Sequence, residues 1–84
     1  MGLTFEDKRF LLGLNITYYR RAKKITQTAL AERVNVTSNY LSQIERGFKT
    51  ASLPIIMAIA DELGISEQDL FDFQKCRSRS QHIG

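Results

Sequence analysis

The sequence predicts an all-α domain of five helices, and three observations support this fold class. Apolar residues recur at the three- and four-residue spacing of amphipathic helices, whereas the alternating pattern of strands is nearly absent. Serine or threonine stands before each apolar segment, where a helix N-cap is expected, and glycine or asparagine follows several of these segments. The 84 residues, of which 43% are apolar, fit one compact domain.

Capping residues and glycines set the limits of the expected helices. Thr4, with Asp7 at the third helical position, forms a capping box that begins the first helix. Gly47 and Gly64 are placed to end the third and fourth helices. The other expected caps are Thr26, Thr37, Ser52 and Ser66. The five helices are expected at residues 5–24, 27–34, 38–46, 53–63 and 67–73.

The first expected helix has more apolar surface than one buried stripe needs. Leu12, Ile16 and Tyr19 form one stripe. A second stripe consists of Phe10, Leu11, Leu14 and Tyr18. Because a helix at the rim of a small domain buries only one stripe, the surplus is expected to cover the last helix or to meet a partner subunit.

Charged residues are distributed unevenly along the chain. Residues 20–50 contain seven basic and two acidic residues, whereas residues 51–73 contain five acidic residues and no basic one. The formal net charge of the whole chain is +3. A basic segment beside an acidic one is typical of a surface directed at a polyanion. A chance partition of solvated charges is the alternative interpretation.

No segment predicts a membrane span, a secretion signal or an enzyme. No run approaches the roughly 20 apolar residues of a transmembrane helix, and the N-terminus lacks the pattern of a signal peptide. Cys76 is the one cysteine and His82 the one histidine, so neither an internal disulfide nor a metal site is expected. The sequence contains no phosphate loop and no metal-ligand spacing. We expect a cytoplasmic protein without cofactor, metal or catalytic residues.

Residues 27–46 contain the residue types that a helix-turn-helix requires. Ala31 is small enough for two helices to cross closely, Asn35 tolerates the positive φ of the turn, and Val36 fills the core beside it. The buried positions of the two helices are expected to be Leu30, Val34, Leu41 and Ile44. Over these 20 residues, each of the named positions carries the residue type that a helix-turn-helix requires, and together they predict the motif.

The segment resembles the helix-turn-helix of the lambda-repressor-like family, also called the Cro/C1-type or XRE family. The resemblance extends over about residues 10–72. The matching residues are Ile16, Arg20, Thr26-Gln27, Leu30-Ala31, Ile44-Glu45-Arg46-Gly47, Ser52-Leu53, Ala60, Leu63-Gly64-Ile65-Ser66 and Asp69-Leu70-Phe71. Asn35 replaces the usual turn glycine and Ala51 a common proline, and neither departure conflicts with the fold. The resemblance implies a compact five-helix domain whose second and third helices bind DNA.

In this family the third helix lies in the major groove of DNA. The resemblance implies base contacts from Ser38, Asn39, Ser42 and Gln43, with Tyr40 on the flank. Asparagine and glutamine suit adenine, because each pairs a donor with an acceptor, and a tyrosine ring can contact a thymine methyl group. An ordinary polar helix face is the alternative interpretation of these residues.

Phosphate contacts are expected around the third helix. The second helix begins at Gln27, and the N–H groups at a helix N-terminus attract a phosphate. The full set of expected phosphate contacts is Thr26, Gln27, Arg46, Lys49, Thr50, Lys23 and Lys24. Solvated surface charge is the alternative for each basic residue in this set.

The resemblance also implies two structural features. Arg20 and Glu45 are expected to form a partly buried ion pair that joins the first helix to the end of the third. A domain this small buries little surface on DNA, so a homodimer is expected. The expected dimer interface consists of Ile65, Leu70, Phe71 and Phe73, with the first helix as a further candidate.

The sequence therefore predicts a transcriptional regulator that binds double-stranded DNA as a homodimer on a near-palindromic operator. Residues 1–73 are expected to form the helix-turn-helix domain, and residues 74–84 a basic, disordered tail. The alternative is an antitoxin-like module, or another protein-interaction module, that uses the same fold to bind a partner protein. The sequence does not specify the operator.

Overall fold

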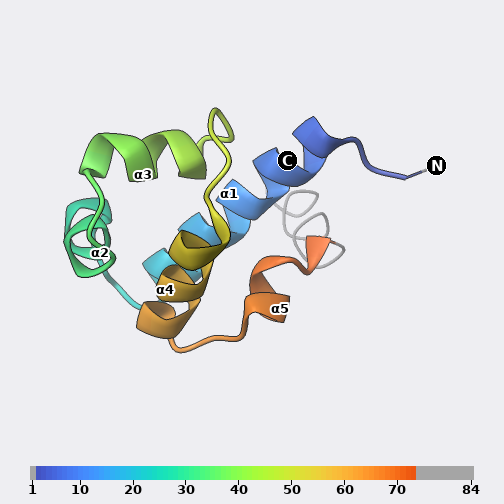
Figure 1. Cartoon of the computed structure of the whole chain (residues 1–84). Coiled ribbons are helices and arrows are strands. Elements are labelled where there is room, and N and C mark those ends of the chain that lie inside the picture. The colour runs from blue at the N-terminus through green and yellow to red at the C-terminus, as the bar shows by residue number, and fades with distance from the viewer. Residues whose placement is uncertain (1, 74–84) are drawn as a thin grey trace.

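Five helices follow one another in the computed structural model, which describes residues 2–73 (Figure 1). They are α1 (Phe5–Ala22), α2 (Gln27–Arg33), α3 (Ser38–Glu45), α4 (Leu53–Leu63) and α5 (Glu67–Leu70). No strand occurs within this described part of the chain, and the predicted all-α, five-helix fold class is confirmed. The predicted tail at residues 74–84, with Cys76 and His82, lies outside the described residues.

The long helix α1 is the element on which the others assemble. It packs against α3, α4 and α5, and α2 packs against α3 and α4. Figure 1 shows α1 crossing the middle of the molecule, with α2 and α3 toward one end and α5 on the other side. In the same view α2 is seen nearly end-on while α3 lies across the picture, so the two helices cross steeply.

One apolar core joins the five helices. Its largest fully buried apolar side chains come from every helix: Ile16, Leu30, Leu41, Ile44, Ile59, Leu63 and Leu70. Burial of a leucine or isoleucine side chain contributes roughly 1.5–3 kcal/mol. Because α2 and α3 each supply at least one such side chain, their orientation is tied to the core.

The helix N-termini use side-chain caps in four of five cases. The hydroxyls of Thr4, Thr26, Thr37 and Ser66 each accept a hydrogen bond from the backbone N–H of the third helical residue. Ser52 occupies the predicted N-cap position of α4, but its side chain makes no such bond.

A residue with positive φ follows each of helices α1 to α4 within two positions of its last residue. These residues are Lys24 (58°), Asn35 (62°), Gly47 (80°) and Gly64 (67°). After α2, for example, the Val36 N–H donates to the Ala31 carbonyl at 2.9 Å, which closes a Schellman-type end. The positive φ predicted at Asn35 is confirmed. The predicted end of α1 at residue 24 is wrong, because Lys24 takes the left-handed conformation and α1 ends at Ala22.

The last helix is shorter than predicted. Helix α5 ends at Leu70 rather than at residue 73. The side chain of Asn15, which is fully buried in α1, donates through Nδ2 to the Leu70 carbonyl at 2.8 Å and to the Asp72 carbonyl at 3.4 Å. This buried amide satisfies carbonyl groups at the end of α5 and ties the chain there to α1.

Gly13 lets α1 and α3 approach each other closely. A Cβ atom at this position would lie 2.5 Å from the carbonyl oxygens of both Ile44 and Glu45. Both neighbours are backbone atoms at the end of α3, so they cannot move aside as a flexible side chain would. Gly13 therefore sets the distance between α1 and the C-terminus of α3.

We expect Gly13→Ala to lower the free energy of unfolding by about 1–3 kcal/mol, the usual cost of overpacking. Helix propensity alone predicts the opposite sign, because alanine is favoured over glycine within a helix by about 1 kcal/mol. Thermal unfolding followed by circular dichroism measures the effect. An unchanged or raised Tm would contradict the close approach.

Candidate nucleic-acid interface

Helices α2 and α3, with the turn between them, form a helix-turn-helix. Ala31 is buried where the helices meet, and Val36 in the turn packs against the core. Leu30, Leu41 and Ile44 are likewise buried, as their spacing predicted. The inner face of α3 is thus fixed by the core, and its other face is left on the surface of the domain.

The outer face of α3 is polar and uncharged. Ser38 and Asn39 are exposed at the start of the helix, and Tyr40, Ser42 and Gln43 are half-buried. The structure therefore places all five predicted base-contact residues on one short helix. The single acidic residue of α3 is Glu45, and it is buried. The exposed part of α3 thus contains no carboxylate that would repel a phosphate.

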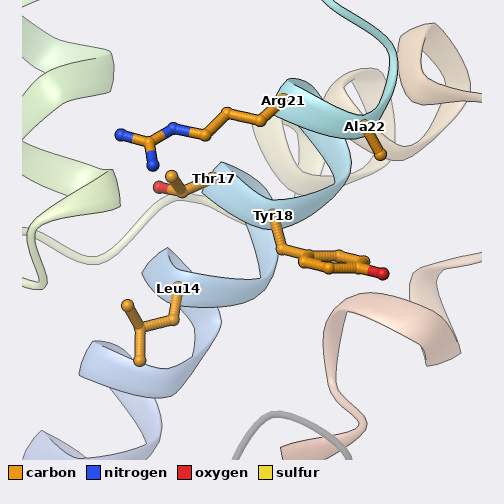
Figure 2. Close-up of a pocket in the computed structure, with 5 residues that line it drawn as sticks. All are labelled: Leu14, Thr17, Tyr18, Arg21 and Ala22. Atoms are coloured by element: carbon orange, nitrogen blue, oxygen red, sulfur yellow. The ribbon is translucent and has the colours of Figure 1, made fainter. Parts of the chain in front are cut away.

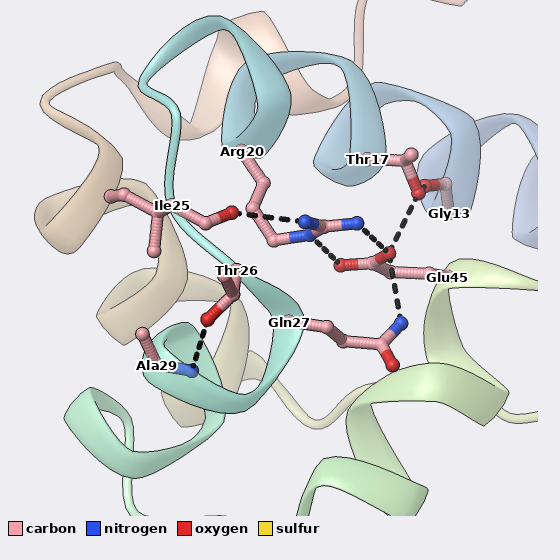
Figure 3. A network of polar contacts seen from close by, with 8 residues as sticks. All are labelled: Gly13, Thr17, Arg20, Ile25, Thr26, Gln27, Ala29 and Glu45. Carbon is pink, nitrogen blue, oxygen red and sulfur yellow. Dashed lines mark hydrogen bonds and ion pairs between the residues drawn. The ribbon is translucent and has the colours of Figure 1, made fainter.

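The Glu45 carboxylate is paired with Arg20 of α1 (Figure 3). Arg20 Nε lies 2.8 Å from Glu45 Oε2, and Arg20 Nη2 lies 3.1 Å from Oε1. The side chains of Arg20 and Glu45 are 10% and 4% exposed. This two-point geometry suits a guanidinium and fixes the direction of both side chains. The ion pair therefore joins the last turn of α1 to the last turn of α3.

Two further side chains donate to the same carboxylate. Thr17 Oγ1 lies 3.0 Å from Glu45 Oε1 and 2.9 Å from the Gly13 carbonyl oxygen, so its one proton is shared between these two acceptors. Gln27 Nε2 lies 3.1 Å from Glu45 Oε1. Arg20 Nη1 also donates to the Ile25 carbonyl at 2.9 Å, in the segment between α1 and α2. We call Thr17, Arg20, Gln27 and Glu45 the Glu45 network. It connects α1, the start of α2 and the end of α3 at one point (Figure 3).

Cationic side chains follow directly after α3. The Arg46 guanidinium lies over the Phe48 ring, 4.8 Å from its centroid, and Lys49 Nζ lies 5.8 Å from the centroid of the Tyr40 ring. Arg46, Lys49 and Phe48 are exposed, the last at 62%. Gly47, between these residues, has a φ of 80°, which turns the chain back after α3. Two cations are thus held on aromatic rings beside the outer face of α3.

The remaining predicted phosphate residues lie in different places. Thr26 and Gln27 are at the N-terminus of α2, and Thr50 is exposed in the loop before α4. Lys24 is exposed after α1. Lys23 Nζ reaches the C-terminal end of α4, within 3.4 Å of the position that a Cβ of Gly64 would take. The structure therefore places the charge of Lys23 at the end of α4 rather than beside α3.

Sequence reasoning missed several residues that position this surface. A glycine within an apolar helix marks a close approach, and this pattern could have identified Gly13. Thr17 follows Gly13 by one helical turn, but nothing in the sequence shows that its hydroxyl faces Glu45. Asn15 lies between apolar residues of α1, and a lone polar residue in a buried stripe predicts a specific hydrogen bond. The contact between Phe48 and Arg46 has no distinctive sequence pattern.

The predicted dimer residues are divided between core and surface. Leu70 is fully buried, so its side chain belongs to the core of its own domain and offers no surface to a partner. Phe71 is 43% exposed, and Ile65 and Phe73 are half-buried. The rings of Phe71 and Phe73 pack edge to face with centroids 6.0 Å apart. Together with Phe5, they border a groove at the N-terminal end of α1.

Two kinds of site are not found in the described part of the chain. Residues 2–73 contain no cluster of histidine, cysteine, aspartate or glutamate that could hold a metal ion. Over the same residues, no helix combines the length and the apolar character that crossing a membrane requires.

Comparison with known proteins assigns the family. The sequence profile of the Helix-turn-helix family HTH_3 matches residues 16–70. The chain therefore belongs to this family of lambda-repressor-like, XRE-type transcription regulators, and the resemblance found in the sequence is confirmed.

Similar proteins include a phage repressor and two regulators of known structure. The chain is 41% identical to the immunity repressor protein of Bacillus phage phi105 over 54 residues, which are 64% of this chain but only 38% of that protein. It superposes with a TM-score of 0.79 on the clp gene regulator ClgR of Corynebacterium glutamicum, at 29% identity over 88% of this chain and 81% of ClgR. SinR of Bacillus subtilis, the master regulator for biofilm formation, was crystallised with DNA. That structure superposes with a TM-score of 0.69, at 32% identity over 73% of this chain and 98% of the crystallised SinR chain.

We expect Glu45→Ala to lower the free energy of unfolding by about 3–5 kcal/mol, because it leaves the buried Arg20 guanidinium without its counter-charge. The double variant Arg20→Met with Glu45→Leu should recover much of this loss, because it removes both buried charges. Glu32→Ala, which removes an exposed acid of α2, serves as the control and should stay within about 0.5 kcal/mol of wild type. Urea unfolding measures all three. A wild-type midpoint for Glu45→Ala would disprove the structural role of the network.

Proposed function

We propose that this chain is a transcriptional regulator that binds double-stranded DNA sequence-specifically, with α3 in the major groove. One observation carries the proposal: the exposed face of α3 is polar and uncharged, its only acid is buried in the Glu45 network, and cations lie directly beyond it. This is the charge pattern that a helix needs in order to lie between two phosphate backbones. The crystal structure of the relative SinR with DNA supports the same use of the motif.

The preference for a particular DNA sequence is proposed to come from side chains in the first two turns of α3. Asn39 and Gln43 can each offer a donor and an acceptor to adenine, and Ser38 and Ser42 can donate or accept. Tyr40 Oη can reach an acceptor at the groove edge, while its ring holds Lys49. These groups lie on rigid helix backbone, which favours defined contacts over adaptable ones.

Register on the DNA is proposed to come from phosphate contacts around α3. Gln27 gives one amide N–H to Glu45, so the second N–H of the same group remains to donate to a phosphate. The Thr26 hydroxyl accepts from the Ala29 N–H, which leaves its own proton for the same purpose. Arg46, Lys49 and Thr50 would hold the backbone beyond α3, with Lys24 as an outer contact. Lys23 is left out of this set, because its ammonium group lies at the end of α4.

The DNA-bound form is proposed to be a homodimer in the cytoplasm. Phe71, Phe73 and Ile65 form the candidate interface, and half-sites about one helical turn apart would match its twofold symmetry. We propose residues 1–73 as the DNA-binding domain. The relatives are named as repressors and regulators, which favours this function over the antitoxin-like alternative.

Selection of bound duplexes from a random pool at low salt tests the function directly. A near-palindromic consensus is expected, with two half-sites at a fixed separation. Absence of any enriched sequence would contradict the proposal, because a basic surface alone retains DNA without distinguishing among sequences.

On the selected duplex, the loss of a base contact and the loss of a phosphate contact should have different effects on binding. Gln43→Ala should weaken binding by about 1–3 kcal/mol and relax the preference at one position of each half-site. Lys49→Ala should weaken binding to all duplexes alike and reduce the slope of log affinity against log salt by about 1. Fluorescence anisotropy over a salt series measures both. Equal loss on every duplex for Gln43→Ala would argue against its contact with a base.

We expect Phe48→Ala to weaken DNA binding by about two- to fivefold, because Arg46 loses the ring that holds its guanidinium. The ring is 62% exposed, so the stability of the domain should change by less than about 0.5 kcal/mol. Phe48→Tyr retains a ring and should bind as wild type does. In an Arg46→Ala background the same Phe48→Ala change should have no further effect, and an additive loss would show that the two side chains act independently.

A further inference from the structure

The outer face of α1 contains apolar side chains that the described fold does not bury. Phe10 is 49% exposed and Tyr18 is 47% exposed, while Leu14 between them is half-buried. The three residues are spaced by four positions, so they form one ridge along the helix, which we call the α1 ridge. Leu14 and Tyr18 also line a surface pocket together with Thr17, Arg21 and Ala22 (Figure 2).

Opposite charges stand at the two ends of the α1 ridge. Asp7 and Arg21 are both exposed, and each lies seven residues, or about 10 Å along the helix axis, from Leu14. Asp7 Oδ2 accepts the Thr4 N–H at 3.2 Å, which leaves Oδ1 for another donor. Within residues 2–73 the one ion pair joins Arg20 to Glu45, so neither Asp7 nor Arg21 is neutralised by a neighbour.

The order of these residues is symmetric about Leu14. An aromatic residue lies four positions to either side, and the charges seven positions away have opposite signs. If a second α1 crosses antiparallel at Leu14, Phe10 faces the partner's Tyr18 and Asp7 faces the partner's Arg21. A contact with twofold symmetry requires such self-complementarity, because every pair of facing residues occurs twice, once on each side of the axis.

We propose that the α1 ridge is a contact between two copies of this chain, formed by antiparallel α1 helices that cross at Leu14. One helix face buries much less than the roughly 1,200–2,000 Å² of a stable protein interface, so the contact is weak and depends on concentration. It shares no residue with the candidate interface at Phe71 and Phe73. It can therefore connect two dimers that occupy neighbouring DNA sites, where the DNA keeps their local concentration high.

Sedimentation velocity over a wide concentration range, without DNA, tests the contact independently of the proposed function. Wild type should associate with rising concentration, and Leu14→Arg should abolish that step. Asp7→Arg and Arg21→Asp should each weaken it by about tenfold, because like charges then face each other twice. The double variant Asp7→Arg with Arg21→Asp should restore association to within about threefold of wild type.

Glu32→Arg is the control, because it makes the same charge change at an exposed acid of α2, away from the α1 ridge. It should associate as wild type does, and circular dichroism melts should show that every variant is folded. Association of wild type no stronger than that of Leu14→Arg would overturn the proposal. Failure of the double charge exchange to restore association would overturn the antiparallel arrangement.

Discussion

The Glu45 carboxylate is the point on which the arrangement of α1, α2 and α3 depends. It accepts two hydrogen bonds from Arg20, one from Gln27 and one from Thr17, and its side chain is 4% exposed. A buried ion pair of this kind adds little net stability over apolar packing, but its directional bonds permit few other geometries. The network therefore matters chiefly because it sets where α3 points.

This constraint works together with the close approach at Gly13. The core alone would tolerate small rotations of α3, because its apolar contacts are not directional. Gly13 fixes how near the end of α3 lies to α1, and the ion pair beside it fixes the direction. Gln27 extends the same restraint to the start of α2. A recognition helix must hold its side chains to within a fraction of an ångström, and these contacts provide that rigidity.

Much of the fold could be predicted from the sequence because caps and apolar spacing act locally. Asn35 illustrates the success, since a turn with positive φ favours few residue types. Lys24 adopts the same conformation without any such preference, and the predicted end of α1 is therefore two residues too late. The early end of α5 depends on the buried Asn15, which lies 55 residues away in sequence. Likewise, the prediction that Leu70 lies in the dimer interface is wrong, because an apolar residue near the end of a helix suits a core and an interface equally and only the structure shows its burial.

The central claim is that α3, held by the Glu45 network, is the element that contacts bases. The most direct measurement is a titration of the isotopically labelled chain with its selected duplex, followed by amide chemical shifts. We expect the largest changes at residues 38–43, with smaller ones at Thr26, Gln27 and the loop after α3. Largest changes on α5 or on the outer face of α1, with α3 unaffected, would contradict it.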